Sequence, residues 1–301
     1  MRTAYLGTSE FAATVLRRLA ASPHRPVLVV TPPDRRQGRG RKVQPPPAAV
    51  AAQELGLDLL QAENVNDEAA LERLRAARPE AVLVCAFGQL IREPLLSEFP
   101  MLNVHPSLLP RWRGAAPIER AMMAGDATTG VCVMKLTEGL DSGPVALCEE
   151  VPIGPDEDFA ALSARLAELG GDLLVRALDL QAEGALEFAE QGEDGVTYAE
   201  KIDSAERRLD PSRPAAELAA KVRALTPHVG VYLETAAGER LGVRQAQIAE
   251  ADVPSGTMEV RDGELLLGCG EGALRLDVVQ PPGGKAMPAD AYLRGHEPPQ
   301  L

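Results

Sequence analysis

The sequence predicts an α/β fold, with a Rossmann-like, mainly parallel sheet in a first domain and a small, OB-like β-barrel in a second. Three observations carry this prediction. Strand-like and helix-like segments alternate in the first half, which is typical of a parallel sheet covered by helices on both faces. A breaker cluster with two prolines follows at residues 210–214. Several short strand-like segments, separated by Gly and Pro, then favour a small all-β domain.

The elements of the first half are justified by their apolar spacing. Continuous apolar runs predict strands at residues 3–6, 27–31, 81–85 and 101–104. Between them, apolar residues at helical spacing predict helices at residues 11–21, 48–55 and 68–77. In open α/β sheets the ligand crevice lies at the carboxyl ends of the strands. We therefore expect a site beyond the strand that ends near residue 104.

A hairpin, a long helix and a linker are expected next. Residues 131–136 and 144–151 are strand-like, and a broad loop at 138–143 separates them. A helix is predicted over 159–182, with Asp156 or Asp158 as its cap. The chain then becomes polar, so we expect a first domain over 1–184, a linker over 185–206 and a second domain over 207–301.

The second domain is predicted to contain one helix and several short strands. Apolar spacing indicates the helix at residues 215–225. Strand-like segments lie at residues 231–235, 240–248, 256–260, 264–268 and 273–279. This number of short strands with turn residues between them is typical of a barrel.

Composition narrows the classes of protein that this chain can be. Its 301 residues, 45% hydrophobic and 25% charged, fit a soluble globular protein with two cores. A net charge of -13 argues against a surface that binds polyanions throughout, so nucleic-acid contact must be local. No apolar run approaches membrane-spanning length, and we expect no membrane association. No CxxC pair occurs among the cysteines, so a reduced, cytoplasmic protein is the expectation; they are Cys85, Cys132, Cys148 and Cys269.

Three polar residues form the candidate catalytic set. Asn103 and His105 are two apart on a predicted strand, so their side chains point to one face. Asp141 lies on the loop of the predicted hairpin. Each has an ordinary structural explanation when taken alone: a strand-terminating amide, a hydrogen-bonded histidine and a turn carboxylate. Together, an amide donor, an imidazole and a carboxylate suit acyl transfer to an amine by direct attack, because no Ser or Cys is evidently placed as a nucleophile.

The sequence around these residues resembles the formyltransferases that use 10-formyltetrahydrofolate. The resemblance rests on residues 103–110, Asn-x-His-Pro-Ser-Leu-Leu-Pro, on the Arg-Trp-Arg-Gly block that follows, and on Asp141-Ser142-Gly143. Further matching blocks lie at residues 6–12, 37–42, 196–201 and 284–287. The first motif is shared by the whole family. The outer blocks are most similar to the branch that formylates methionyl initiator tRNA.

The resemblance implies roles for individual residues. Asn103, His105 and Asp141 would carry the chemistry, with 10-formyltetrahydrofolate as the formyl donor and no metal or NAD. The turn at residues 7–9 also lacks the GxGxxG spacing of a dinucleotide site. The implied folate-binding residues are Gly88, Leu90, Ile91, Ser107, Leu108, Leu109, Pro110, Glu138 and Gly139.

A basic segment stands out against the acidic chain. Residues 34–42 carry five positive residues and one negative residue, a local charge of +4. The ordinary interpretation is a solvated loop. The resemblance implies instead a loop that binds the acceptor arm of tRNA, where guanidinium groups pair with phosphates. The implied tRNA-binding residues are Arg35, Arg36, Arg39, Arg41, Lys42 and Lys201.

Two other functions remain open at this stage. A formyltransferase acting on an amino sugar nucleotide would share the catalytic set and the folate without needing the basic loop. A nonenzymatic tRNA-binding module could keep the same scaffold, although the intact catalytic set speaks against it. We expect a monomer that binds methionyl initiator tRNA and a small-molecule folate.

Overall fold

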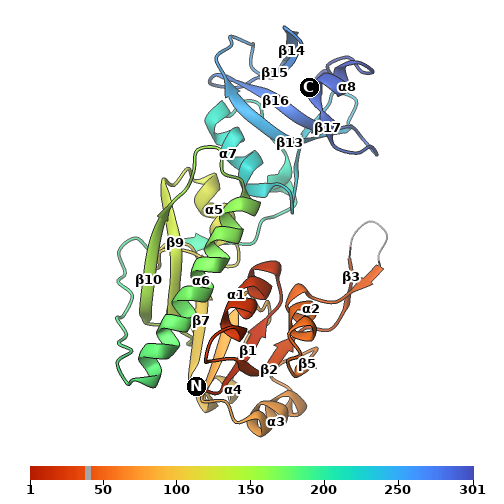
Figure 1. Cartoon of the computed structure of the whole chain (residues 1–301). Helices are drawn as coiled ribbons and strands as arrows, with labels where there is room; N and C mark the ends of the chain where they lie inside the picture. The colour runs from red at the N-terminus through yellow and green to blue at the C-terminus, as the bar shows by residue number, and fades with distance from the viewer. Residues whose placement is uncertain (38–41) are drawn as a thin grey trace. The chain divides into compact units, whose positions relative to one another are not determined.

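The computed structural model describes residues 1–37 and 42–301, which form two units (Figure 1). Unit 1 comprises Met1–Gly114, Thr128–Pro152 and Ser163–Tyr198. Unit 2 comprises Ala115–Ala127, Ile153–Leu162 and Ala199–Leu301. Each unit is therefore assembled from three separate stretches of the chain.

Unit 1 is built on a seven-stranded sheet in the order β10-β9-β7-β6-β1-β2-β5. The strands from β7 to β5 run parallel, and the β9–β10 hairpin joins β7 in antiparallel pairing. This arrangement confirms the predicted mainly parallel sheet. The strands are β1 (Thr3–Gly7), β2 (Pro26–Thr31), β5 (Leu59–Gln61), β6 (Ala81–Cys85), β7 (Met101–His105), β9 (Thr128–Lys135) and β10 (Val145–Pro152).

Helices cover both faces of this sheet. On one face, Leu71 and Leu74 of α3 pack in a core cluster with alternate residues of the central strands, including Leu6. On the other face, Tyr5 donates a hydrogen bond to the carbonyl oxygen of Ala12 in α1. The helices of the first half are α1 (Glu10–Ala20), α2 (Pro47–Glu54), α3 (Glu68–Ala77), α4 (Leu95–Glu98), α5 (Pro117–Met123) and α6 (Phe159–Ala182). The predicted long helix matches α6, and Asp158 rather than Asp156 caps it by accepting from Ala161 N.

The basic segment forms a hairpin and not a plain loop. Strand β3 (Arg35–Gln37) pairs antiparallel with β4 (Lys42–Gln44). Three-residue strands are too short for an alternating pattern to reveal, which explains why the sequence predicted only a loop. The candidate tRNA-binding residues Arg39 and Arg41 lie outside the described residues.

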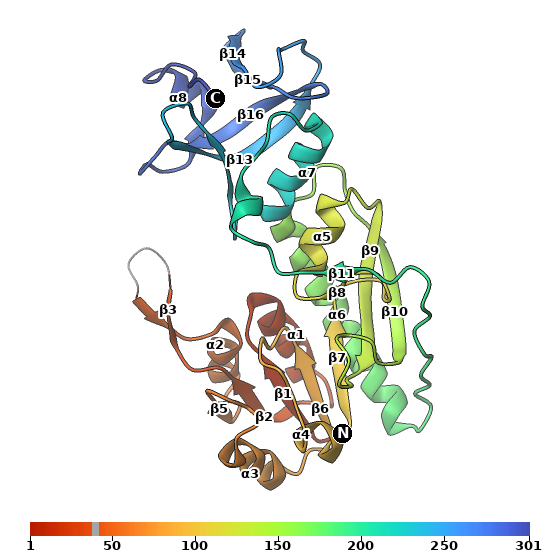
Figure 2. The same ribbon diagram turned by 180° about the vertical axis from the view of Figure 1, so that it is seen from behind.

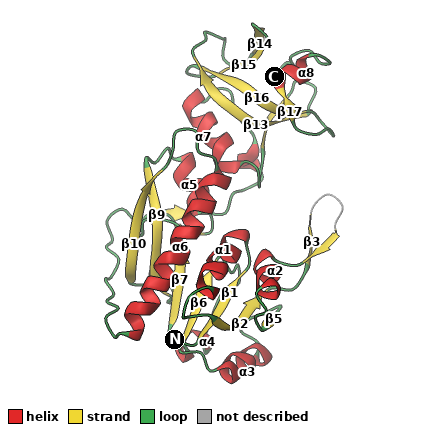
Figure 3. Ribbon diagram, viewed as in Figure 1, coloured by secondary structure: helices red, strands yellow, loops and turns green. Residues whose placement is uncertain are grey.

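Unit 2 contains a six-stranded antiparallel sheet, ordered β12-β13-β16-β15-β14, with β17 beside β16. Figure 3 shows that strands dominate the chain after α7 (Ala215–Leu225). This confirms the predicted small β domain. Its strands are β12 (Val231–Glu234), β13 (Arg240–Ala249), β14 (Met258–Arg261), β15 (Glu264–Gly268), β16 (Ala273–Gln280) and β17 (Met287–Pro288). The remaining short elements are β8 (Arg113–Gly114), β11 (Tyr198–Ala199), the 3₁₀ helix η1 (Ala205–Arg207) and α8 (Ala289–Leu293).

Two of the four cysteines form a disulfide, so the expectation of fully reduced cysteines is wrong for this pair. Cys132 of β9 and Cys148 of β10 lie directly opposite each other in the hairpin register. The spacing of cysteines along the chain could not show this, because the hairpin register brings residues 16 apart together. Cys85 and Cys269 are free and buried. No helix in the two described stretches is long and apolar enough to cross a membrane.

Candidate active site

Strand β7 delivers Asn103 and His105 to one face of the sheet. Both side chains lie at its carboxyl end, and the two residues are only 8% and 4% exposed. Figure 2 shows β7, β6 and β1 side by side; Asn103 is in register with Val84 of β6, which is in register with Leu6 of β1. The predicted common orientation of the two side chains is confirmed.

The loop between β9 and β10 brings Asp141 to the same place. Asp141 has a φ of +44°, a left-handed conformation that Asp tolerates better than most residues. Two residues later, a Cβ atom on Gly143 would stand 2.0 Å from the carbonyl oxygen of Lys135. Only glycine fits there, so the loop folds tightly against the end of β9. The tight fold directs the Asp141 carboxylate toward β7.

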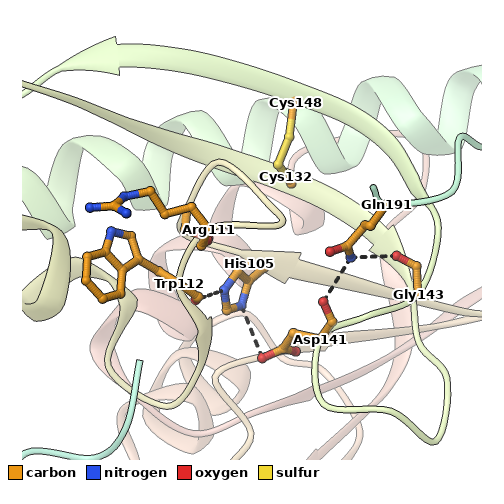
Figure 4. Close-up of a disulfide and its surroundings, with 9 residues drawn as sticks. His105, Arg111, Trp112, Cys132, Asp141, Gly143, Cys148 and Gln191 are labelled. Carbon is orange, nitrogen blue, oxygen red and sulfur yellow. Dashed lines mark hydrogen bonds and ion pairs between the residues drawn. A yellow bond between two sulfur atoms is a disulfide. The ribbon is translucent and has the colours of Figure 1, made fainter. Parts of the chain in front are cut away.

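The three candidate catalytic residues come together around the Asp141 carboxylate, and Figure 4 shows this carboxylate beside the His105 ring. Its Oδ2 atom accepts a hydrogen bond from the backbone N–H of Gly114 at 2.9 Å and lies 3.6 Å from Nδ1 of His105. Its Oδ1 atom accepts from Nδ2 of Asn103 over a long 3.4 Å. The Asp141 side chain is 15% exposed, so these contacts form where water competes weakly.

The hydrogen bond formed by Nε2 of His105 shows which nitrogen of the ring is available for proton transfer. Nε2 is 2.8 Å from the carbonyl oxygen of Trp112, and a carbonyl oxygen only accepts hydrogen bonds. Nε2 therefore carries a proton. In the neutral ring, Nδ1 is then the unprotonated nitrogen, and it faces Asp141. A proton taken up by His105 would therefore reside at Nδ1, on the side of the ring that faces Asp141.

Trp112, which orients His105, is held by a distant part of the chain. Trp112 has a φ of +63°, and its N–H donates to Oγ1 of Thr197 at 2.9 Å. The next residue, Arg113, donates its N–H to the carbonyl oxygen of Thr197 at 2.9 Å. Residues 185–198 were expected in a linker, yet this stretch packs within unit 1. Thr197 lies in one of the blocks that carry the family resemblance, but its contact with Trp112 could not be predicted, because it joins residues 85 positions apart.

The candidate folate-binding residues lie on two loops and a turn. Gly88, Glu138 and Gly139 are exposed, and the Leu90 side chain is 64% exposed, whereas Ile91 is buried. Leu140, on the same loop as Glu138 and Gly139, is 61% exposed next to Asp141. Apolar side chains held open to solvent suit a flat, partly apolar ligand such as a pterin.

Two amide side chains hold the first of these loops in place. Gln89 accepts from Val65 N at 2.8 Å and donates to the carbonyl oxygen of Ala62 at 2.9 Å. Asn66 donates to the carbonyl oxygen of Leu90 at 2.8 Å. These contacts leave the Leu90 side chain free, so the loop is ordered without covering it.

The turn after β7 uses one candidate folate residue internally. Ser107 is fully buried, and its hydroxyl donates to the carbonyl oxygen of Arg111 at 2.7 Å. Its role here is to shape the turn. Leu108, Leu109 and Pro110 are partly exposed and remain available for contact with a ligand.

Comparison with known proteins identifies the family. The family described as Formyl transferase matches residues 1–178, and its C-terminal domain matches residues 201–297. The chain belongs to the formyl transferase family.

Named members of the formyl transferase family resemble this chain over nearly its whole length. The methionyl-tRNA formyltransferase of Parvibaculum lavamentivorans is 42% identical over 98% of this chain and 97% of that relative. The methionyl-tRNA formyltransferase of Stenotrophomonas maltophilia is 45% identical over 97% of each chain. An N-formyltransferase from Helicobacter canadensis, solved with folinic acid and dTDP-3-aminofucose, has a TM-score of 0.67 at 12% identity. It covers 91% of this chain and 98% of its own, and it shows that the fold is shared.

The candidate tRNA-binding residues of this formyl transferase are exposed where the structure describes them. Arg35 and Arg36 lie on β3 and Lys42 lies on β4 in unit 1, and none of them forms an ion pair with another described residue. Lys201 is exposed in unit 2. Within residues 1–37 and 42–301, no group of His, Cys, Asp or Glu side chains could hold a metal ion.

Proposed function

We propose that this protein transfers the formyl group of 10-formyltetrahydrofolate to the α-amino group of methionyl initiator tRNA. The products are N-formylmethionyl-tRNA, which serves translation initiation, and tetrahydrofolate. The observation that carries the proposal is the identity of 42% and 45% to two methionyl-tRNA formyltransferases over nearly the full chain. The clustered Asn103, His105 and Asp141 side chains supply the groups that this reaction needs.

The mechanism follows from the positions of these three side chains. The neutral amine attacks the formyl carbon directly, and the carbonyl oxygen becomes an oxyanion. Asn103 Nδ2 and protonated His105 stabilise that oxyanion through hydrogen bonds. Asp141 keeps His105 oriented and supports proton transfer at Nδ1, directly or through water. The bond from the formyl carbon to N10 of the folate then breaks, and N10 receives the proton that the amine releases.

Binding of the two substrates is assigned to separate surfaces of the chain. The donor contacts the loops at 88–91 and 138–141, whose exposed Leu90 and Leu140 favour an aromatic ligand. The turn at 108–110 adds further contacts. The β3–β4 hairpin, together with Lys201, contacts tRNA phosphates. The protein acts as a monomer in the cytoplasm, and residues 207–301 form a domain that can add tRNA contacts.

An amino sugar nucleotide is the alternative acceptor. The structural similarity to a sugar-nucleotide enzyme is a similarity of fold at 12% identity, and it does not favour that acceptor. A small acceptor does not need the basic hairpin, whereas its five basic side chains suit the phosphates of a polyanion. A nonenzymatic binding module is disfavoured because Asn103, His105 and Asp141 are all present and lie together.

One incubation tests the proposal. The purified protein is mixed with 10-formyltetrahydrofolate and methionyl initiator tRNA, and the methionine released from the tRNA is analysed by mass spectrometry. We expect the mass to increase by one formyl group. A parallel reaction with an amino sugar nucleotide is the control. Formylation of the sugar but not of the methionine would overturn the assignment.

A further inference from the structure

The carboxamide of Gln191 touches the loop that carries Asp141. Its Nε2 atom donates to the backbone carbonyl oxygen of Asp141 at 2.9 Å and to that of Gly143 at 2.7 Å (Figure 4). An amide nitrogen has two hydrogens, and both are used here. The two acceptors bracket the tight part of the loop. Gln191 thus connects two backbone carbonyl groups of the loop through one side-chain amide.

Arg113 determines which way the Gln191 carboxamide faces. The Oε1 atom of Gln191 accepts from Nε and Nη2 of Arg113 at 3.0 and 2.8 Å. A guanidinium group has only donors, so it requires an oxygen at this position and places the NH₂ group toward the loop. A carboxamide turned by 180° would face Arg113 with its donors and would leave both loop carbonyls without a partner.

The backbone holds Gln191 at the edge of the sheet. Val145 at the start of β10 and Ala189 exchange two hydrogen bonds, of 2.8 and 2.9 Å. This isolated bridge fixes the chain two residues before Gln191. The side chain is therefore supported both by its own backbone and by Arg113.

The contacts matter because Asp141 is in a conformation that needs support. Its φ of +44° costs free energy relative to extended or helical backbone, and such residues persist only where their surroundings hold them. A rotation of this peptide would move the carboxylate away from Gly114 N and from Nδ1 of His105. We propose that Gln191 is a positioning residue, which keeps the Asp141 carboxylate in its place beside His105. This inference rests on the proposed function.

Gln191→Glu is the most informative variant. The glutamate side chain has the same shape and keeps an oxygen for Arg113, but it has no N–H to donate to the carbonyls of Asp141 and Gly143. We expect kcat for methionyl-tRNA formylation to fall by about 10- to 10²-fold, the scale of misplacing a catalytic group. Gln191→Ala is expected to lower kcat by a similar factor. The KM for tRNA should stay within about twofold, since the defect lies in the chemical step.

A double substitution separates positioning from general destabilisation. If Gln191 acts through the Asp141 carboxylate, Gln191→Ala lowers kcat less than about twofold when Asp141→Ala is already present. A merely structural role would lower kcat by the same factor in both backgrounds. Gln53→Glu, the same change at an exposed position of α2, is the matched control and should behave as wild type.

The outcomes distinguish this inference from the function on which it rests. Circular dichroism and thermal melting first confirm that each variant is folded at the assay temperature. A wild-type protein that fails to formylate methionyl-tRNA contradicts the proposed function. A wild-type protein that is active, alongside a Gln191→Glu variant with at least half of its kcat, contradicts the positioning role alone. Equal loss of kcat from Gln191→Ala with and without Asp141 also contradicts it.

Discussion

A single carboxylate organises the candidate active site. Asp141 accepts from Gly114 N and Asn103 Nδ2 and faces Nδ1 of His105, all from a left-handed backbone position. Its neighbour Gly143 permits this, because no larger residue fits against Lys135. The position of the Asp141 carboxylate thus depends on the conformation of the loop between β9 and β10.

Substitution of the catalytic set is the first test at the scale of the residue. Asn103→Ala, His105→Ala and Asp141→Ala should each lower the formylation rate by at least about 10²-fold, as expected for loss of an oxyanion donor or a general acid or base. The variants should still fold. Single-turnover formylation measures the loss, with circular dichroism as the control. Near wild-type turnover in a folded variant would remove that residue from the mechanism.

The cysteines give a second prediction at this scale. Burial raises the pKa of the Cys85 thiol to about 12 and that of Cys269 to about 11, so neither forms the reactive thiolate at neutral pH. Cys132 and Cys148 are joined to each other. Protein kept free of reductant should resist iodoacetamide at pH 8 while native, and should show two reactive thiols after unfolding.

Mass spectrometry after alkylation counts these thiols. Rapid labelling of the native protein would show that Cys85 or Cys269 is accessible. Four thiols in the unfolded, unreduced protein would show that the disulfide does not form in solution.

Sequence alone indicated the candidate catalytic groups and not the contacts that support them. Asn103 and His105 are two apart on a strand, a local relation that the sequence displays directly. Gln191 and Thr197 reach the site through contacts with residues 50 and 85 positions away. Thr197 lies in a block that carries the family resemblance, whereas nothing local distinguishes Gln191, and neither contact can be read from the sequence. Such residues become visible only when the chain is folded.

At the scale of the element, one ion pair connects helix α5 to the short 3₁₀ helix η1 in unit 2. Arg120 of α5 donates to both carboxylate oxygens of Glu206 in η1, at 2.6 and 3.0 Å. The same guanidinium donates to the carbonyl oxygen of Glu200 at 3.1 Å. The pair is partly buried, so it is screened less than an ion pair on the open surface.

The Arg120–Glu206 pair predicts a pH-dependent stability. The hydrogen bonds from Arg120 lower the pKa of Glu206 below its ordinary value of 4.5. A lowered pKa in the folded state means that the stabilisation is present above pH 4.5 and is lost as the pH falls through the folded pKa. Glu206→Gln should therefore lower Tm at pH 7, and the gap from wild type should narrow toward pH 4 and below. Thermal melts across this range measure it, and a gap that is constant or widens contradicts the assignment.

The longer helices were predicted better than the shortest elements. Helices α3, α6 and α7 match the sequence prediction at both ends, because their apolar patterns extend over several helical turns, and strands β6 and β15 match as well. The β3–β4 hairpin and α5 were not predicted. Each is short, and α5 is held in unit 2 by tertiary contacts such as the Arg120 ion pair, which a local pattern does not contain.

At the scale of the whole molecule, charge is distributed unevenly. The net charge is -13, yet the segment at 34–42 has a local charge of +4. The rest of the chain therefore carries a net charge of -17, while this one segment is positive. This contrast predicts that tRNA phosphates are attracted to the segment at 34–42 more than to the rest of the chain.

Kinetics at several salt concentrations test the role of the hairpin. Replacing Arg35, Arg36 and Lys42 with Ala should raise the KM for methionyl-tRNA. It should also make KM less dependent on salt, with the slope of log KM against log salt concentration falling by about one unit or less for each lost phosphate contact. Arg39→Ala and Arg41→Ala are expected to change the KM and its salt dependence in the same direction. Folate binding, measured by thermal shift, should barely change and serves as the control. An unchanged KM and slope across all variants would indicate a merely solvated hairpin and would favour a small-amine acceptor.

The assembly of each unit from three stretches has a consequence for exchanging parts between related enzymes. A chimaera joined at one point near residue 184 would take the segments at 115–127 and 153–162 from one parent and the rest of unit 2 from the other. It would also replace Gln191 and Thr197 without replacing the loop and turn that they hold. We therefore expect an exchange between diverged parents at this point to separate Gln191 and Thr197 from the residues that they contact. An exchange that keeps the stretches of each unit together should disturb the site less.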